Sequence, residues 1–357
     1  MQDYIIEDSV FKYRTITDYS EEFESIARYL NEYINKTDGV KTVTVNGTNY
    51  SVKNWNYTDD GQLDFITNGD VGEIAKRSFV FCENGSFPRT VSGNEYTVIL
   101  TKDYYVCNHE VTQKEYQAIM GINPSVFNGS SGYEPADEEN QENRPVENVS
   151  WFDAIVYCNK RSMAAGVTPC YSVTDNLGNT STNPADWKNT ASPSTTYTPH
   201  TGQEIQGTVS CNFDANGYRL PTEAEWEFAA RGGNKTHGYT YSGTNDDASD
   251  LSNYAWYGDS IDKTHEVMKK LGNELGLYDM SGNVYEWCWD WFGSYSYTTE
   301  SVEDPVVVPG TDEWRRILRG GCWDSSEASK CSSTNRYQYY CADKNNYSGF
   351  RVVRTAQ

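Results

Sequence analysis

Residues 276–287 read Gly276-Leu277-Tyr278-Asp279-Met280-Ser281-Gly282-Asn283-Val284-Tyr285-Glu286-Trp287 and form the longest motif in this chain of 357 residues. The glycines and the asparagine at its centre indicate a tight loop. Five further motifs surround it in the order Glu110-Val111-Thr112-Gln113-x-x-Tyr116, Arg144-Pro145-Val146-x-x-Val149-Ser150-Trp151-x-Asp153-Ala154, Tyr218-Arg219-Leu220-Pro221-Thr222-Glu223-Ala224-Glu225-Trp226-Glu227, Arg319-Gly320-Gly321-x-Trp323 and Gly349-Phe350-Arg351. Together they predict one domain over about residues 79–357.

Three helix starts within this domain have the spacing of a capping box, in which a hydroxyl and a carboxylate satisfy each other's backbone N–H groups. They are Thr112 with Glu115, Ser150 with Asp153, and Thr222 with Glu225. The second and third helices are expected to bury one face each, and residues 171–210 are expected to form a surface insertion with little periodicity. Few helices among short strands and Gly- and Asn-rich stretches predict an α+β fold with many irregular loops.

The first 78 residues lie outside these motifs and are expected to form an N-terminal extension. Phe23, Ile26, Leu30 and Ile34 form an apolar stripe at helical spacing. The sequence over 43–52 predicts a hairpin around an Asn-Gly turn, which supplies the two positive-φ residues of a type I′ turn. Neither feature carries chemistry.

In this order the motifs resemble the formylglycine-generating-enzyme (sulfatase-modifying factor) family. The resemblance implies a C-type-lectin-like fold that presents its C-terminal segment on one face. It also implies where catalysis would occur, since the family's enzymes oxidise a substrate cysteine with two copper-binding cysteines. Counted from Gly320-Gly321, those positions hold Ser325 and Lys330, while Cys331 lies one residue past the second. A hydroxyl or an ammonium cannot replace a thiolate as a Cu(I) ligand, so we predict a protein that is not an enzyme.

Two kinds of metal site occur in proteins of this fold. An iron-binding branch needs paired histidines, whereas His109, His200, His237 and His265 are remote from one another in sequence. The resemblance also implies a structural calcium ion held by Asp279, Gly282, Val284 and Glu286, and oxygen ligands in a tight loop suit Ca²⁺. The alternative is that the two carboxylates accept hydrogen bonds from backbone N–H groups without an ion. No other cofactor is required.

The composition of the chain limits the kinds of partner that the protein can bind. The formal net charge of −22 and the pI near 4.5 exclude a nucleic-acid partner, which would require clustered Lys and Arg. No apolar run approaches the ~20 residues of a transmembrane helix. The nine dispersed cysteines contain no Cys-x2-Cys pair and leave the redox compartment open. The start of the chain has no export signal, so either the protein is cytoplasmic or a signal has been removed.

The C-terminal region, about 319–357, is mostly Ser, Tyr, Asn and Asp, the composition of an adaptable recognition surface. Its framing segments, 316–318 and 350–353, are expected to be strands. The region resembles the variable proteins of diversity-generating retroelements, whose treponemal members are lipid-anchored surface lipoproteins. In that group, mutagenesis of AAY codons yields Ser, Tyr, Asp, Asn or Cys. The candidate variable, ligand-binding positions are Asp324, Ser325, Ser326, Ser332, Ser333, Tyr337, Tyr339, Tyr340, Tyr347 and Ser348.

The leading hypothesis is therefore a monomeric, non-enzymatic cell-surface protein that binds an exposed protein or glycan through a diversified C-terminal face. Two alternatives remain open at this point. One is a thiol-oxidising, formylglycine-generating enzyme. The other is an inactive structural or regulatory family member with an ordinary polar C-terminal loop region.

Overall fold

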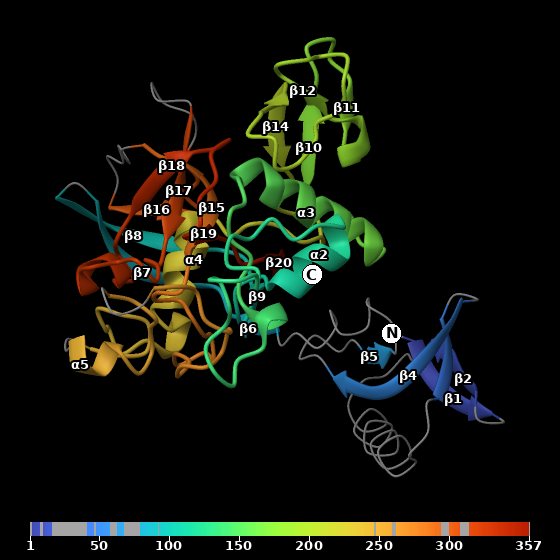
Figure 1. Cartoon of the computed structure of the whole chain (residues 1–357), viewed down its shortest axis with the longest axis horizontal. Helices are drawn as coiled ribbons and strands as arrows, with labels where there is room; N and C mark the ends of the chain where they lie inside the picture. Colours follow the sequence, from blue (N-terminus) through green and yellow to red (C-terminus); the bar gives the residue numbers. More distant parts are fainter. Residues whose placement is uncertain are drawn as a thin grey trace. The chain divides into compact units, whose positions relative to one another are not determined.

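The computed structural model describes residues 2–7, 10–15, 41–45, 48–57, 63–67, 79–91, 93–245, 248–258, 262–293, 300–307 and 314–356 (Figure 1). The chain divides into two compact units, Met1–Phe79 and Val80–Gln357. The candidate site lies wholly in the second unit.

The first unit contains a five-stranded sheet in the order β1-β2-β3-β4-β5. Its strands are β1 (Gln2–Glu7), β2 (Val10–Thr15), β3 (Lys41–Val45), β4 (Thr48–Tyr57) and β5 (Leu63–Thr67). The predicted hairpin is present, because β3 pairs antiparallel with β4 and Val45 lies opposite Thr48. The Asn46-Gly47 turn and the helix predicted from the apolar stripe lie outside the described residues.

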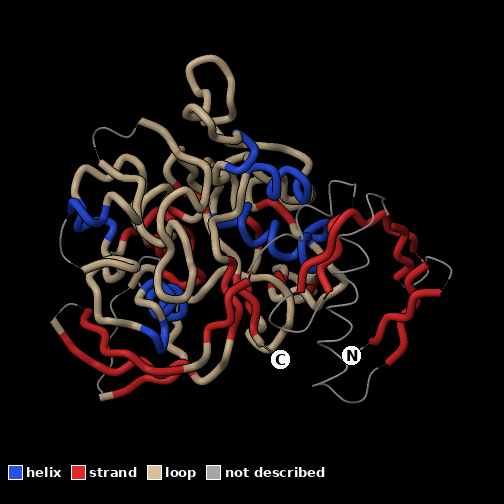
Figure 2. Tube along the Cα trace, turned by 90° about the horizontal axis from the view of Figure 1, so that it is seen from below, coloured by secondary structure: helices blue, strands red, loops and turns tan. Residues whose placement is uncertain are grey.

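The second unit is built from short strands joined by long loops, as Figure 2 shows, and the predicted α+β class is confirmed. Its larger sheets have the orders β18-β17-β15-β19, β16-β8-β7 and β20-β9-β6. Their strands are β6 (Phe79–Cys82), β7 (Gly85–Val91), β8 (Asn94–Leu100), β9 (Tyr104–Cys107), β15 (Tyr285–Trp291), β16 (Ser301–Glu303), β17 (Arg315–Arg319), β18 (Tyr337–Tyr340), β19 (Ser348–Gly349) and β20 (Val353–Thr355).

All three predicted capping boxes are present, at the starts of α2 (Gln113–Met120), α3 (Trp151–Ala164) and α4 (Glu223–Ala230). The expectation of one buried face was too narrow, since every residue of α4 and most of α3 are buried because other elements surround both helices. A short helix, α5, spans Ala248–Leu251. No helix in the described part of the chain is long and apolar enough to cross a membrane.

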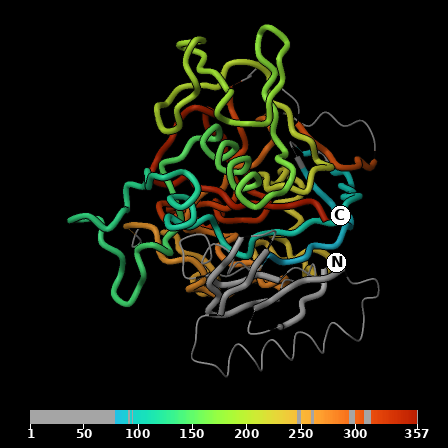
Figure 3. Tube along the Cα trace, turned by 90° about the vertical axis from the view of Figure 1, so that its right-hand side faces the viewer, coloured from blue at the N-terminus to red at the C-terminus, as the bar shows by residue number. Residues whose placement is uncertain are grey.

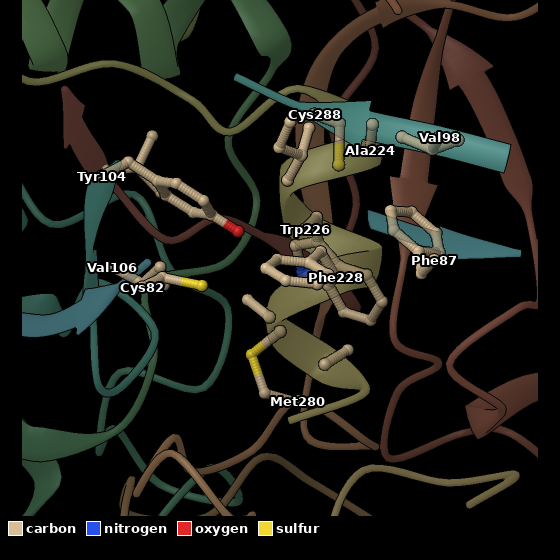
Figure 4. Packing of buried hydrophobic residues seen from close by; sticks show 14 of the residues in the cluster. Cys82, Phe87, Val98, Tyr104, Val106, Ala224, Trp226, Phe228, Met280 and Cys288 are labelled. Carbon is tan, nitrogen blue, oxygen red and sulfur yellow. The ribbon is translucent and has the colours of Figure 1, made fainter. Parts of the chain in front are cut away.

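The main hydrophobic core surrounds α4. Trp226 and Phe228 project from this helix among Phe87, Val98 and Met280, together with the other buried side chains of the cluster (Figure 4). Phe87 stacks on Phe228 with ring centroids 5.6 Å apart. Because β7, β8, β15 and β17 all contribute to this core, it fixes the sheet that carries the C-terminal region.

Residues 171–211 are more ordered than the sequence indicated. They form a lobe of two small sheets that projects beyond α3 (Figures 1 and 3). Its strands are β10 (Tyr171–Thr174), β11 (Thr180–Ser181), β12 (Lys188–Asn189), β13 (Ile205–Gln206) and β14 (Thr208–Cys211). Trp187 and Tyr197 are buried within it. Strands of two to four residues are too short for a period-2 pattern to predict.

Candidate functional site

The loop of residues 276–287 lies beneath the C-terminal region and holds it in place. The Asn283 side chain donates to Glu110 Oε2 at 2.7 Å, and the Val284 N–H donates to Glu110 Oε1 at 3.0 Å. The Gly282 N–H donates to the Gly320 carbonyl, and the Trp323 N–H donates to the Asn283 carbonyl, both at 2.9 Å. The motif therefore ties the start of the C-terminal region to the body of the domain.

Arg351 forms a buried ion pair with Glu286, one of the predicted calcium ligands. Its guanidinium donates to the two Glu286 oxygens at 2.6 and 2.7 Å, and also to the carbonyls of Cys107 and Tyr278. Trp226 Nε1 donates to Glu286 Oε2 at 2.7 Å. The charge of Glu286 is therefore balanced inside the protein.

Calcium at Asp279, Gly282, Val284 and Glu286 stays a prediction. Asp279 Oδ2 accepts the Met268 N–H at 2.8 Å, which leaves Asp279 Oδ1 as a buried oxygen without a hydrogen-bond partner. A bound cation would satisfy such an oxygen. Burial raises the pKa of Asp279 to about 6, so this carboxyl is mostly ionised at neutral pH.

Chelation tests the calcium prediction. A calcium site filled at a hundred times its Kd would add about 2.7 kcal/mol, which corresponds to a melting-temperature change of more than about 5 °C. The melting temperature should therefore be several degrees higher in calcium chloride than in excess EGTA. Superimposed melts would contradict a calcium site.

The two positions that match the family's catalytic cysteines are unsuited to thiol chemistry. Ser325 is buried, and its Oγ accepts the Cys322 N–H at 3.0 Å and lies 3.6 Å from Cys322 Sγ. Lys330 Nζ lies 3.4 Å from Ser326 Oγ. Burial raises the pKa of Cys322 to about 11 and that of Cys331 to about 12. Both thiols are therefore protonated at neutral pH, whereas the thiolate is the form that reacts and binds metals.

Four tyrosines from three segments come together on one side of the sheet β18-β17-β15-β19. Alternation along β18 places Tyr337 and Tyr339 on the same side. Tyr337 stacks on Tyr285 with ring centroids 4.8 Å apart, and Tyr347 makes edge contacts with Tyr285 at 6.3 Å and with Tyr339 at 6.4 Å. We call Tyr285, Tyr337, Tyr339 and Tyr347 the tyrosine cluster.

Tyr285 was not among the predicted site residues, because it precedes the C-terminal region by more than thirty positions. Tyr285 is buried and contacts two of the three half-buried tyrosines of the C-terminal region, Tyr337 and Tyr347. One feature of the sequence could have indicated Tyr285. It belongs to the 276–287 motif, which places it directly after a tight loop.

The ten predicted ligand-binding positions separate into two groups. Six are half-buried or exposed: Asp324, Ser326, Tyr337, Tyr339, Tyr340 and Tyr347. The other four, Ser325, Ser332, Ser333 and Ser348, are buried and cannot contact a partner in this conformation. Ser332 and Ser333 each donate a hydroxyl to the Thr240 carbonyl, which gives them a structural role. Their small, polar side chains suggested that these serines would be exposed, but in the folded chain they are packed inside.

The framing strands agree only in part with the prediction. β17 includes the predicted segment 316–318, and its pairing with β18 places Leu318 opposite Tyr337 and Arg315 opposite Tyr340. Residues 350–352 are not in a strand, because Arg351 turns inward to Glu286, and β20 begins only at Val353.

Neighbouring positions in the C-terminal region provide a direct test of this division. Ser348→Tyr places a large ring at a fully buried position in β19, and we expect it to cost about 1–3 kcal/mol. Tyr347→Ser removes a half-buried ring and is expected to cost about 0.5–1.5 kcal/mol. Urea unfolding of the two variants measures both values. Equal stability of Ser348→Tyr and the parent chain would contradict the placement of Ser348.

The histidines do not form a metal site, but they are more constrained than their isolation in the sequence suggested. His109 Nε2 lies 3.1 Å from Glu115 Oε1, and His265 Nδ1 lies 2.8 Å from Glu139 Oε1. His200 Nδ1 lies 3.4 Å from Asp153 Oδ2, which joins the lobe of residues 171–211 to α3. These three pairs hold segments together, whereas His237 is exposed.

Comparisons with known proteins agree with this arrangement. The family model of the sulfatase-modifying factor enzyme 1-like domain matches residues 68–356. The structure of Treponema denticola variable protein 1 is 37% identical, with a TM-score of 0.64, and the match covers 78% of this chain and 95% of that one. The chaperone protein LppX of Paenibacillus barcinonensis is 38% identical over 69% of this chain and 79% of its own length.

An enzyme of the family is also similar over a shorter stretch. The formylglycine-generating enzyme of Streptomyces coelicolor is 39% identical over 121 residues, which are 30% of this chain and 38% of that enzyme. The predicted similarity to a treponemal variable protein and the C-type-lectin-like fold are both confirmed. The chain belongs to the sulfatase-modifying factor, or formylglycine-generating-enzyme, family.

Proposed function

We propose that this protein is a non-enzymatic binding protein and that its C-terminal region, about 319–357, forms a diversified ligand-binding face on an invariant scaffold. The observation that carries the proposal is the tyrosine cluster, which collects half-buried rings from β18 and from the turn before β19 on one side of a sheet. Tyrosine provides a large, rigid contact area at low entropy cost. Asp324, Ser326 and Tyr340 add exposed polar groups from the same region.

Hydrogen bonds from the scaffold hold this face in place. Arg336, which directly precedes β18, donates to both oxygens of Glu223 at 2.6 and 2.9 Å. Trp323 Nε1 donates to the Asn346 carbonyl at 3.0 Å and so joins two turns of the face. A binding face supported by locked neighbours loses less conformational entropy when a partner binds.

Diversification is supported by residue type and by similarity. Each of the six accessible positions holds a residue that substitution within an AAY codon can produce. Such substitution cannot produce the residues at the adjacent positions Trp323, Glu327, Lys330 and Gln338. The similarity to Treponema denticola variable protein 1 covers most of the chain. We infer that the six positions vary between copies of the gene while the framework remains constant.

The ligand class and the cellular location follow from the same proposal. A Tyr- and Ser-rich face suits an exposed protein or a surface glycan, because tyrosine contributes apolar area and hydrogen bonds together. We propose that the chain acts as a monomer at the cell surface as a lipoprotein. Protease treatment of intact cells should degrade it; full protection from the protease would contradict a surface location.

Thiol oxidation is the rival function, since relatives such as the Streptomyces coelicolor protein carry the name formylglycine-generating enzyme. The buried, protonated thiols of Cys322 and Cys331 argue against it. Incubating the protein with copper and a cysteine-containing sulfatase peptide should leave the peptide cysteine unchanged by mass spectrometry. Formation of formylglycine would overturn the non-enzymatic assignment.

The binding proposal can be tested with two displayed libraries of equal size. In one, Asp324, Ser326, Tyr337, Tyr339, Tyr340 and Tyr347 vary among the residues that AAY codons yield. In the other, six exposed positions of the loop 130–142 vary in the same way. Selection against hen lysozyme should give specific binders from the first library at a much higher frequency. Equal frequencies would contradict a specialised binding face.

A further inference from the structure

A cavity lies beside the C-terminal region, between β15, β17 and the lobe of residues 171–211. Its volume is about 720 Å³, within the range of about 300–1,000 Å³ that is typical of small-molecule sites. Its walls include Trp151, Trp289, Trp291 and Trp314. Trp314 is 53% exposed, so the aromatic lining reaches the surface of the protein.

Arg316 is the cation of this cavity. The centre of its guanidinium lies 3.6 Å from the ring centroid of Trp291, 3.8 Å from that of Trp151 and 5.0 Å from that of Trp289. The side chain is 2% exposed and donates to the Trp289 carbonyl. Its Nε has no hydrogen-bond partner.

No carboxylate of the described residues forms an ion pair with Arg316. Asp290 is the nearest acid along β15, and its two oxygens accept the N–H groups of Glu223 and Val307 instead. Glu204 also lines the cavity but makes no ion pair with Arg316. Arg316 differs in this respect from Arg219, Arg319 and Arg351, which are equally buried but each form an ion pair with a glutamate. Burying a cation without an anion is costly unless a partner arrives.

We propose that this cavity binds small molecules that carry a carboxylate on an apolar or aromatic body. The carboxylate would accept charge-assisted hydrogen bonds from Arg316, whose planar guanidinium suits bidentate recognition. The body of the ligand would pack against the tryptophan rings. This site is separate from the tyrosine cluster, although Arg316 lies opposite Tyr339 in the β17–β18 pairing, so an occupied cavity would border the proposed binding face.

The test compares 4-phenylbutyrate with its neutral amide, 4-phenylbutyramide, by isothermal titration calorimetry on the intact chain. We expect the acid to bind at least about tenfold more tightly, since hydrogen bonds to a charged partner contribute about 1.5–3 kcal/mol. Arg316→Gln should reduce binding of the acid to that of the amide. Trp314→Ala should weaken both ligands, and Tyr347→Ser should affect neither.

Two further measurements keep the proposal decidable. Glu204→Gln removes a negative charge from the cavity wall and should strengthen binding of the acid but not of the amide. If Arg316→Gln does not fold, the comparison of acid with amide on the unchanged chain, together with Trp314→Ala, still decides. Equal binding of acid and amide, or no binding of either, would overturn the proposal. So would binding of the neutral sugar cellobiose without binding of the acid.

Discussion

Glu223→Gln is expected to destabilise the protein by about 3–5 kcal/mol, because it leaves several buried arginines short of a negative charge. Glu223 is fully buried at the start of α4. Its carboxylate forms ion pairs with Arg89 at 3.0 Å, Arg319 at 3.3 Å and Arg336 at 2.6 Å. Two of these arginines belong to the C-terminal region, so the variant should also loosen the proposed binding face. Urea unfolding at pH 7 measures the loss.

The ion pairs of Glu223 should also make the stability of the protein depend on pH. Burial alone would raise the pKa of Glu223, but Arg89, Arg336 and Arg319 hold it well below its ordinary value of 4.5. A carboxyl whose pKa is lowered by folding stabilises the protein above its unfolded-state pKa, and that contribution is lost as the pH falls below about 4.5. The difference in the free energy of unfolding between the parent chain and Glu223→Gln should therefore become smaller under acidic conditions. Glu327→Gln, at an exposed carboxylate, is the control, and a comparable loss in this variant would contradict the argument.

Gly282→Ala is expected to cost about 2–5 kcal/mol for two reasons that add together. Gly282 has a φ of +84°, a conformation that residues with a Cβ adopt only with strain. An added Cβ would also lie 2.4 Å from the Trp256 carbonyl oxygen and 2.8 Å from the Trp256 nitrogen. Both neighbours are backbone atoms, so the loop itself would have to move. Unfolding in urea is the measurement.

Gly276 provides a matched control within the same motif. Its φ is +80°, but an added Cβ would meet no atom within 4 Å. Gly276→Ala should therefore cost only the conformational strain, about 1–2 kcal/mol. If the two alanine variants were equally stable, the close packing of Gly282 on Trp256 would not contribute, and the role of this loop as an anchor would be wrong.

Local patterns in the sequence were sufficient to predict the helix starts. The capping boxes at Thr112, Ser150 and Thr222 depend on residues three positions apart, and such short-range hydrogen bonds form in the same way in most folds. The hairpin of β3 and β4 was predicted for the same reason. The scarcity of helices among short strands predicted the α+β class, whereas the ordered motifs predicted the C-type-lectin-like fold.

Long-range packing limited the prediction of the site. Arg351 and Glu286 are 65 positions apart, and only the folded chain shows that they form a buried ion pair. Ser325 was expected to touch a ligand, yet it is buried against Cys322 because the turn folds inward. The tryptophan cavity combines residues from 151 to 341, and no single stretch of sequence contains enough of them to indicate a site.

The proposed binding face therefore lies slightly apart from Ser325, which was predicted to match a catalytic cysteine of the family. Ser325 and Cys322 lie beneath the surface, whereas the tyrosine cluster and Tyr340 are displayed on and beside β18. This arrangement lets the displayed residues change without disturbing the buried thiols or the Glu223 ion pairs. Tolerance of this kind is what repeated diversification requires.

Sequencing the gene across related isolates tests the central proposal most directly. Differences should concentrate in the codons for Asp324, Ser326, Tyr337, Tyr339, Tyr340 and Tyr347. A neighbouring near-copy of the C-terminal coding region should have AAY codons at those positions. The codons for Glu223, Gly282, Glu286 and Arg351 should stay constant. Differences scattered evenly over residues 79–357, or an invariant C-terminal region without a near-copy, would contradict it.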